Sequence, residues 1–161
     1  MSDAHVFEIT LTYPASTAQA TPPDANFSRD NIMKSAGKHD VAASSPAAFG
    51  GDDARYNPEE LLLMSLSECH MLTYLAIAAK KQITIVGYED RATGQLGIGE
   101  FGVAGKTSMQ KVTLHPRVTV GKGTNLDDAQ AIHVKAHANC FMANSVNFPI
   151  TTEPEIIEAA I

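Results

Sequence analysis

The sequence predicts an α+β fold, and three observations lead to that prediction. Residues 6–13 alternate between apolar and polar side chains, which is typical of a half-buried strand. The run from residue 58 to about residue 81 has no interior glycine or proline and suits a helix of about 24 residues. Further strands and helices follow without a regular strand–helix–strand alternation, which favours α+β over a parallel α/β arrangement.

Composition and charge limit the class of protein. The chain has 161 residues, 44% of them hydrophobic, which suits one domain over residues 1–161. Its net charge of −6 and its lack of a basic run argue against a nucleic-acid partner. The most apolar stretch, residues 61–79, carries Ser65, Glu68 and His70 near its centre, so we expect no membrane span. The N-terminus lacks the pattern of a secretory signal, and we expect a cytoplasmic protein.

The part before the long helix is predicted to hold two strands and two loops. The first strand has an apolar face made of Phe7, Ile9, Leu11 and Tyr13. A loop is predicted over residues 15–24 and a second strand over residues 26–33. Residues 37–56 are rich in small and polar residues and are predicted to form a long surface loop, and loops of that length often carry function.

The long helix has clear start and end signals. Its first turn carries the residue types that begin helices: Asn57, Pro58, Glu59 and Glu60. Lys80 and Lys81 place positive charge at its C-terminal end. Because the helix is apolar nearly all round, we expect a central helix covered by a sheet or by another subunit.

The part after the helix is predicted to contain strands first and helices later. Three strands are predicted over residues 83–93, 99–104 and 108–120, and Pro116 indicates a bulge or an edge position in the last. A turn, two helices and a closing strand follow over residues 121–125, 127–138, 140–146 and 148–152.

The two cysteines, Cys69 and Cys140, are too few for a disulfide framework. They leave three interpretations: inert core thiols, a metal site, or redox chemistry. His133 and His137 lie four residues apart on a predicted helix, yet no acidic or cysteine ligand completes a zinc motif with them. We therefore expect no metal and interpret these histidines as structural or solvent-facing.

The segment Asn57-Pro58-Glu59-Glu60-Leu61-Leu62, ending in Ser67-Glu68-Cys69-His70, resembles the signature of the OsmC/Ohr family. This family comprises the osmotically inducible protein C and organic hydroperoxide resistance proteins, in which an Asn-Pro-Glu helix start precedes the reactive cysteine by about three turns. The second cysteine, in Ala136-His137-Ala138-Asn139-Cys140, also stands where the family has one, before the last strand. The resemblance covers nearly the whole chain.

The resemblance implies an intertwined homodimer with long central helices flanked by antiparallel sheets and with active sites at the subunit interface. It implies a cysteine-based peroxidase that reduces organic hydroperoxides, or hydrogen peroxide, in oxidative or osmotic stress defence. The reaction would pass through a Cys69 sulfenic acid and a Cys69–Cys140 disulfide, which an external dithiol of lipoyl or thioredoxin type would reduce. No flavin, haem, nucleotide or other cofactor is implied.

The resemblance also assigns roles to residues around Cys69. Glu59 matches the family's catalytic Glu, and Arg29 is the first choice for its catalytic Arg, with Arg55 as the alternative. Arg55 and His70 are assigned to substrate binding. A cationic neighbour would favour the thiolate of Cys69. Glu59 and Cys69 are separated by about 15 Å along a straight helix, so we expect Glu59 to serve the cysteine of the other subunit.

Two features bear on the alternatives. Glu68 directly precedes Cys69, and a neighbouring carboxylate opposes thiolate formation. A non-catalytic or small-molecule-binding relative with the same dimer fold is therefore a second hypothesis.

Cys140 is expected at the start of the predicted third helix, where its thiolate would leave easily when the disulfide is reduced.

Overall fold

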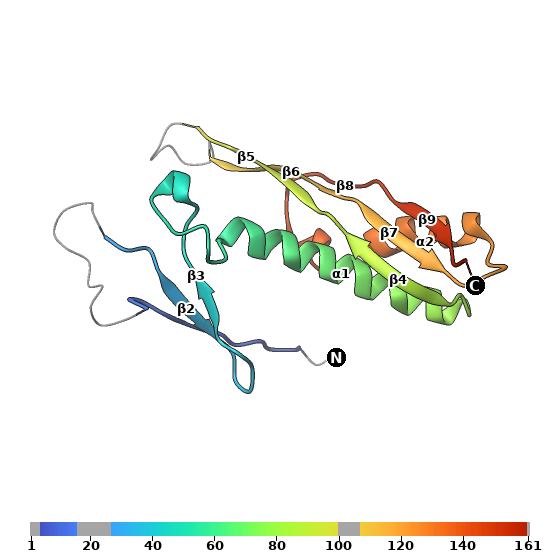
Figure 1. Ribbon diagram of the computed structural model, residues 1–161, viewed down its shortest axis with the longest axis horizontal. Coiled ribbons are helices and arrows are strands. Elements are labelled where there is room, and N and C mark those ends of the chain that lie inside the picture. Colours follow the sequence, from blue (N-terminus) through green and yellow to red (C-terminus); the bar gives the residue numbers. More distant parts are fainter. Residues whose placement is uncertain (1–3, 16–26, 100–106, 161) are drawn as a thin grey trace. The chain divides into compact units, whose positions relative to one another are not determined.

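The computed structural model describes residues 4–15, 27–99 and 107–160. These residues form two α-helices, two short 3-10 helices and three sheets of three strands each (Figure 1), which confirms the predicted α+β class. The chain divides into two compact units, Met1–Leu61 and Leu62–Ile161, and the boundary falls inside the first α-helix.

The first unit is built around an antiparallel sheet. Its strands, in the order in which they pair, are β1 (Thr10–Thr12), β2 (Asn31–Lys34) and β3 (Val41–Ala43). The first two fall at or near the predicted strands but are shorter. The third strand and a 3-10 helix, η2 (Ala47–Phe49), lie within residues 37–56. The prediction of a loop there is wrong in part, because a strand of three residues is too short to show periodicity.

The apolar face of the predicted first strand lies open. Phe7 is 91% exposed, Ile9 65% and Leu11 60%. The expectation of a half-buried strand is therefore wrong for a single chain, because nothing in the described part of the chain covers these side chains. Clustered apolar side chains that face water usually mark an interaction surface.

Helix α1 (Pro58–Lys80) begins with a capping box. The Glu60 backbone N–H donates to Asn57 Oδ1 at 2.8 Å, and the Asn57 backbone N–H donates to Glu60 Oε2 at 3.2 Å. Pro58 occupies the first helical position, where its missing N–H costs no hydrogen bond. The predicted start is confirmed, and the predicted end is correct to within one residue.

Replacing Asn57 by alanine removes one half of this box. We expect Asn57→Ala to lower the free energy of unfolding by about 1 kcal/mol, because the Glu60 N–H then loses its acceptor. Urea unfolding followed by circular dichroism measures the change. Asn57→Ser keeps an acceptor and should stay within about 0.5 kcal/mol of the wild type; equal losses in both variants would contradict the capping role.

The second unit contains two sheets of three strands, and in both sheets the central strand has one antiparallel and one parallel neighbour. Its strands are β4 (Ile85–Asp90), β5 (Thr93–Gly97), β6 (Ser108–Leu114), β7 (Pro116–Val120), β8 (Ile150–Thr152) and β9 (Glu155–Glu158). The sheet orders are β4-β7-β9 and β5-β6-β8. The pairs β4–β7 and β5–β6 are antiparallel, whereas β6–β8 and β7–β9 are parallel. In Figure 1, β6 continues into β7 and β8 into β9.

Several strand boundaries differ from the sequence prediction. The strand predicted over residues 108–120 is two strands that meet at His115, and Pro116 begins the second of them. Strand β5 was not predicted, because two glycines in its five residues hide its periodicity. Strand β9 follows the predicted closing strand and has a glutamate at each end. The strand predicted over residues 99–104 lies outside the described residues except for Gly99, which is not in a strand.

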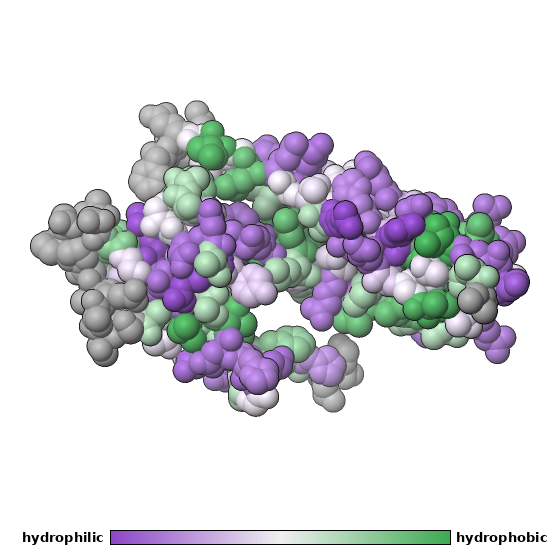
Figure 2. All heavy atoms as spheres, in the orientation of Figure 1, coloured by the Kyte–Doolittle hydropathy of each residue, from purple (hydrophilic) through white to green (hydrophobic). Residues whose placement is uncertain are grey.

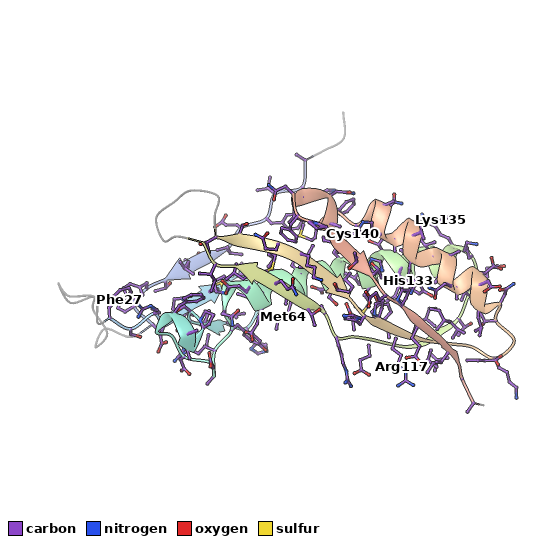
Figure 3. All side chains as sticks on the ribbon, turned by 90° about the horizontal axis from the view of Figure 1, so that it is seen from above. Phe27, Met64, Arg117, His133, Lys135 and Cys140 are labelled. Atoms are coloured by element: carbon purple, nitrogen blue, oxygen red, sulfur yellow. The ribbon has the colours of Figure 1, made fainter. Side chains whose placement is uncertain are left out.

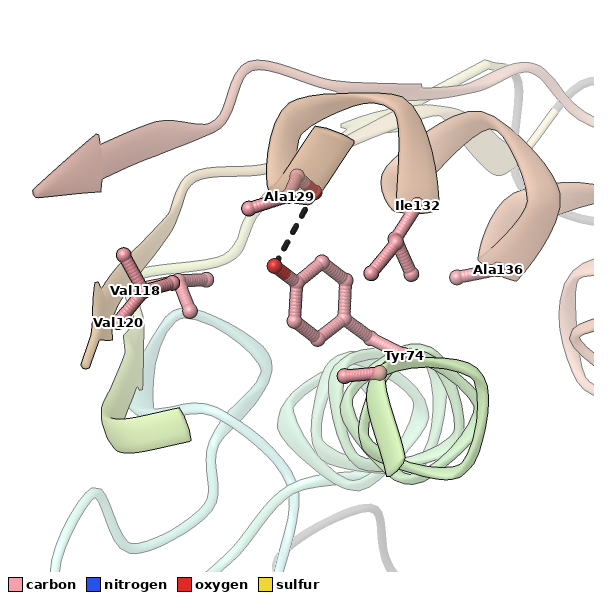
Figure 4. Close-up of a cluster of buried hydrophobic side chains, with 7 residues drawn as sticks. Tyr74, Val118, Val120, Ala129, Ile132 and Ala136 are labelled. Atoms are coloured by element: carbon pink, nitrogen blue, oxygen red, sulfur yellow. Dashed lines mark hydrogen bonds between the residues drawn. The ribbon is translucent and has the colours of Figure 1, made fainter. Parts of the chain in front are cut away.

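Helix α2 (Leu126–Asn139) packs against α1 in the core of the second unit (Figure 4). The Asn125 side chain caps it by accepting the N–H groups of Asp127 and Asp128. In the centre, the fully buried Tyr74 donates its hydroxyl to the Ala129 carbonyl at 3.1 Å. The cluster around it contains Tyr74, Ala78, Val118, Val120, Ala129, Ile132 and Ala136. A second cluster is formed by Leu66, Val112 and Leu114.

Helix α1 buries one stripe of side chains and leaves apolar residues outside it. The buried residues follow a four-residue spacing, which places them on one face: Leu66, His70, Tyr74 and Ala78. Met64 and Leu72, off this stripe, are 46% and 54% exposed. With a mean hydropathy of 1.5, α1 is long and apolar enough to cross a membrane, but core helices of soluble proteins share this property.

Candidate active site around two cysteines

Helix α1 and the turn after α2 bring the two cysteines together. Met142 follows Cys140 by two residues, and its backbone N–H donates to Cys69 Sγ at 3.5 Å. The Ala143 N–H donates to Cys140 Sγ at 3.4 Å. Both cysteines are free thiols, and Cys140 is labelled in Figure 3. A single turn therefore directs one N–H group to each sulfur atom.

Hydrogen bonds hold this turn in place. The Asn144 N–H donates to the Cys140 carbonyl at 3.0 Å, and the Asn144 side chain donates to the Ala138 carbonyl at 3.2 Å. The Ser145 hydroxyl donates to the Phe141 carbonyl at 2.7 Å. Of the helix predicted over residues 140–146, only the 3-10 turn η3 (Ala143–Ser145) forms. Cys140 is the C-terminal cap of α2 rather than the first residue of a helix.

The two thiols have different environments. Cys69 is partly exposed, whereas Cys140 is 1% exposed. Burial, together with a side-chain hydrogen bond to Cys69, raises the pKa of the Cys140 thiol to about 11. The expectation that Cys140 leaves easily as a thiolate is therefore wrong, because this environment favours the protonated thiol. Cys69 is thus the more accessible of the two cysteines, and its sulfur accepts the Met142 N–H.

Close to Cys69 on α1, Ser67 is held by a hydrogen bond that does not involve the Cys69 thiol. The Ser67 hydroxyl donates to Asp90 Oδ2 at 2.5 Å, and the other oxygen of that carboxylate accepts the His115 N–H at 2.7 Å. Asp90 thereby links α1 to the junction of β6 and β7. Glu68, which precedes Cys69 in the chain, is exposed to solvent.

His70 lies in the core, where it pairs with a histidine of α2. Its Nε2 lies 3.0 Å from Nδ1 of His133, and the rings stack with centroids 5.3 Å apart. Burial, more than any neighbouring charge, lowers the pKa of each histidine to about 4. This position favours a structural role for His70 over the substrate-binding role assigned from sequence. Within the described ranges, no group of three or more His, Cys, Asp or Glu residues is arranged to hold a metal ion.

The two candidate arginines lie in the first unit and differ in their partners. Arg29 Nη1 donates to the carbonyls of Phe27 and Gly50, each at 3.1 Å, and its guanidinium lies 4.5 Å from the centre of the Phe27 ring. It has no carboxylate partner in the described part of the chain. Arg55 Nε, by contrast, lies 3.4 Å from a carboxylate oxygen of both Asp30 and Asp52. The charge of Arg55 is offset locally, and that of Arg29 is not.

Gly50 positions Arg29, and sequence reasoning missed it. Its φ of 79° lies in the left-handed region that glycine favours, and a Cβ atom there would stand 2.8 Å from Arg29 Nη1. The signal in the sequence is the Gly50-Gly51 pair inside a segment predicted to be a functional loop. The N–H groups of Met142 and Ala143 were also missed, because a backbone contact leaves no mark in residue identity.

The Glu59 side chain takes no part in the capping box of α1. Glu60 makes the reciprocal hydrogen bond of the capping box, while Glu59 Oε2 is buried with no hydrogen-bond partner among the described residues. Glu59, Arg29 and Arg55 all belong to the first unit, and both cysteines belong to the second. Within the second unit, the structure brings Cys69 and Cys140 together.

Comparisons with known proteins show what the chain is similar to. Residues 50–155 match the family model of OsmC-like proteins. An OsmC-like protein of unknown function from Vibrio cholerae is 34% identical, with a TM-score of 0.82 over 96% of this chain and 100% of that one. The sequence has no significant match among curated proteins.

More distant solved structures share the fold. An organic hydroperoxide resistance protein from Elizabethkingia anophelis is 21% identical, with a TM-score of 0.69 over 99% of this chain and 100% of its own. The organic hydroperoxide resistance protein OhrB of Bacillus subtilis is 20% identical, with a TM-score of 0.63 over 95% and 98% of the two chains. With the family model covering most of the sequence, the chain belongs to the OsmC-like protein family.

Proposed function

We propose that this protein is a thiol-dependent peroxidase that reduces organic hydroperoxides, or hydrogen peroxide, with Cys69 as its reactive thiol. The observation that carries the proposal is the pairing of the partly exposed Cys69, whose sulfur accepts the Met142 N–H, with the buried Cys140. An N–H donor stabilises the negative charge of a thiolate. The names of the relatives from Elizabethkingia anophelis and Bacillus subtilis agree with this chemistry.

The first step transfers one oxygen atom to Cys69. Its thiolate attacks the peroxide oxygen that carries the hydrogen, an S–O bond forms, and the O–O bond breaks. The other oxygen leaves as an alkoxide, takes a proton and departs as the alcohol. Cys69 is then a sulfenic acid. The peroxide is reduced by two electrons, and the sulfur of Cys69 supplies both.

The second step forms the disulfide. The Cys140 sulfur attacks the Cys69 sulfur, the S–O bond breaks, and the hydroxyl leaves as water with the proton of the Cys140 thiol. Because Cys140 is protonated at neutral pH, it brings this proton to the step. An external dithiol, of lipoyl or thioredoxin type, would then reduce the disulfide by exchange.

Arg29 and Glu59 complete the proposed site. Arg29 is favoured over Arg55 as the activating cation because no carboxylate in the described ranges offsets its charge, whereas two carboxylates contact Arg55. Glu59 is favoured because its carboxylate is not used by the helix cap. Since ten residues of one continuous helix separate Glu59 from Cys69, we assign Glu59 to the active site of the other subunit.

We also propose that the protein is a cytoplasmic homodimer. The open apolar face with Phe7, Ile9 and Leu11, and the exposed Met64 and Leu72 on α1, are surfaces that a second copy would cover. Hydrophobic side chains also reach the surface on the face seen in Figure 2. If a second copy covers the exposed apolar side chains of α1, they are shielded from water without a membrane. Cross-linking and light scattering should give twice the mass of one chain.

The alternative is an OsmC-like dimer without efficient chemistry, which Glu68 beside Cys69 favours. Peroxide consumption separates the two. The protein is supplied with cumene hydroperoxide or hydrogen peroxide, and with dihydrolipoamide or a thioredoxin system. A peroxidase consumes many equivalents of at least one peroxide with at least one dithiol. Consumption no faster than that by the dithiol alone would support the non-catalytic alternative.

A further inference from the structure

Asn144 ties the end of α2 to the turn that follows it. Its side-chain amide donates to the Ala138 carbonyl at 3.2 Å, and its backbone N–H donates to the Cys140 carbonyl at 3.0 Å. The last carbonyl groups of an α-helix have no partner within the helix, and Ala138 is the last residue but one of α2. Asn144 therefore supplies, from beyond the helix, a donor that the helix end lacks.

The residues between the two ends of this tie serve both thiols. The Met142 N–H donates to Cys69 Sγ at 3.5 Å. The Ala143 N–H donates to Cys140 Sγ at 3.4 Å. Core packing does little to fix this turn, because all of residues 141–145 except Ala143 are exposed. Its position therefore depends on hydrogen bonds.

Two side chains of the turn make such bonds, and they act differently. The Ser145 hydroxyl donates to the Phe141 carbonyl at 2.7 Å, which stiffens the turn internally. The Asn144 side chain bonds instead to α2, which packs against α1, the helix that carries Cys69. Asn144 thus holds the turn in place relative to the two sulfur atoms.

We propose that Asn144 is a positioning residue for disulfide formation between Cys69 and Cys140. It acts through the backbone of the turn, which it holds so that the Cys140 sulfur can reach the Cys69 sulfur. A tie that already exists in the reduced protein lowers the entropy lost when the S–S bond forms. This role rests on the proposed function in one respect, namely that the two thiols are partners in a disulfide.

The test measures disulfide formation without any peroxide. The full-length protein is equilibrated with glutathione at several ratios of the reduced to the oxidised form. After acid quenching and alkylation, the peptide pair joined through Cys69 and Cys140 is quantified by mass spectrometry. One oxidised glutathione takes two electrons and two protons from the two thiols and leaves as two reduced molecules. The equilibrium constant reports how well the folded chain holds the two sulfur atoms together.

Three variants separate the tie from a general effect on the fold. Asn144→Ala removes the side-chain bond, and we expect it to lower the equilibrium constant about threefold to tenfold. Asn144→Asp keeps the shape but has no N–H to donate, so its loss should be at least as large. Asn139→Ala is the matched control, because Asn139 makes the same kind of bond within α2, to the Lys135 carbonyl at 2.8 Å; the constant should change less than twofold.

Lower global stability alone does not change this constant while the reduced and oxidised chains both stay folded, which circular dichroism checks. Equal constants in the wild type and Asn144→Ala, or equal losses in Asn144→Ala and Asn139→Ala, would overturn the proposal. So would a wild-type protein that forms no Cys69–Cys140 disulfide with glutathione. Peroxide consumption tests the proposed function separately: a protein that consumes none but shows the expected constants refutes the peroxidase and keeps the role of Asn144.

Discussion

Replacing Cys69 by serine is expected to lower peroxide consumption by at least about a thousandfold, to the background rate of the reductant. Serine keeps the size of the side chain, but its hydroxyl is not ionised at neutral pH and cannot attack the O–O bond. The thiol of the partly exposed Cys69, which accepts the Met142 N–H, has no substitute in the described site.

Cys140→Ser is the matched control, because it removes the other thiol of the same pair. We expect this variant to reduce one equivalent of peroxide per chain and then to stop, with Cys69 trapped as a sulfenic acid that dimedone labels. Rapid-mixing kinetics of both variants against cumene hydroperoxide make the comparison. A Cys69→Ser protein that still turns over, or a Cys140→Ser protein that never reacts once, would contradict the assigned roles.

Acidification is expected to destabilise the protein between about pH 6.5 and pH 4. Burial lowers the pKa of both His70 and His133 from 6.5 in the unfolded chain to about 4 in the folded protein. As the pH falls through this window, the unfolded state therefore takes up protons before the folded state does. Stability is full above the unfolded pKa and falls toward the folded pKa, by an amount on the order of 3 kcal/mol for each histidine.

Urea unfolding at several pH values between 4 and 7.5 measures this loss. The double variant His70→Leu with His133→Leu removes both partners of the 3.0 Å contact and both titrating groups, so its stability should change little between pH 6.5 and pH 4.5. His39→Gln, a substitution at an exposed histidine, is the control and should keep the wild-type pH dependence. An undiminished slope in the double variant would show that other groups cause the acid loss.

The sequence was sufficient to predict the elements that local signals define. Helix α1 was predicted because Asn57, Pro58 and Glu60 are start signals that act within four residues of one another. Helix α2 was predicted for a similar reason, although its cap at Asn125 was assigned to the preceding turn. Strand β3 was not predicted because its three residues are too few to show a period. Strands β5 and β9 were not predicted because short strands with glycines or glutamates depend on their neighbours for pairing.

The residues of the candidate site that belong to a local motif could be predicted from the sequence, whereas contacts between distant segments could not. Cys69, Cys140 and Glu59 were identified from a motif that resembles a family signature. The sequence could not reveal that His70 bonds to His133 or that a backbone turn directs an N–H to each sulfur, because distant segments meet only after folding. The expected acidity of Cys140 was wrong because it assumed a helix start, where the folded chain has a buried helix end.

Counting free thiols as peroxide is added tests the central claim most directly. The reduced protein, without any external dithiol, is mixed with increasing amounts of cumene hydroperoxide, and the remaining thiols are alkylated and counted by mass spectrometry. The account predicts that one equivalent of peroxide removes both thiols of each chain and yields a peptide pair joined through Cys69 and Cys140. An unchanged thiol count at equimolar peroxide would contradict it.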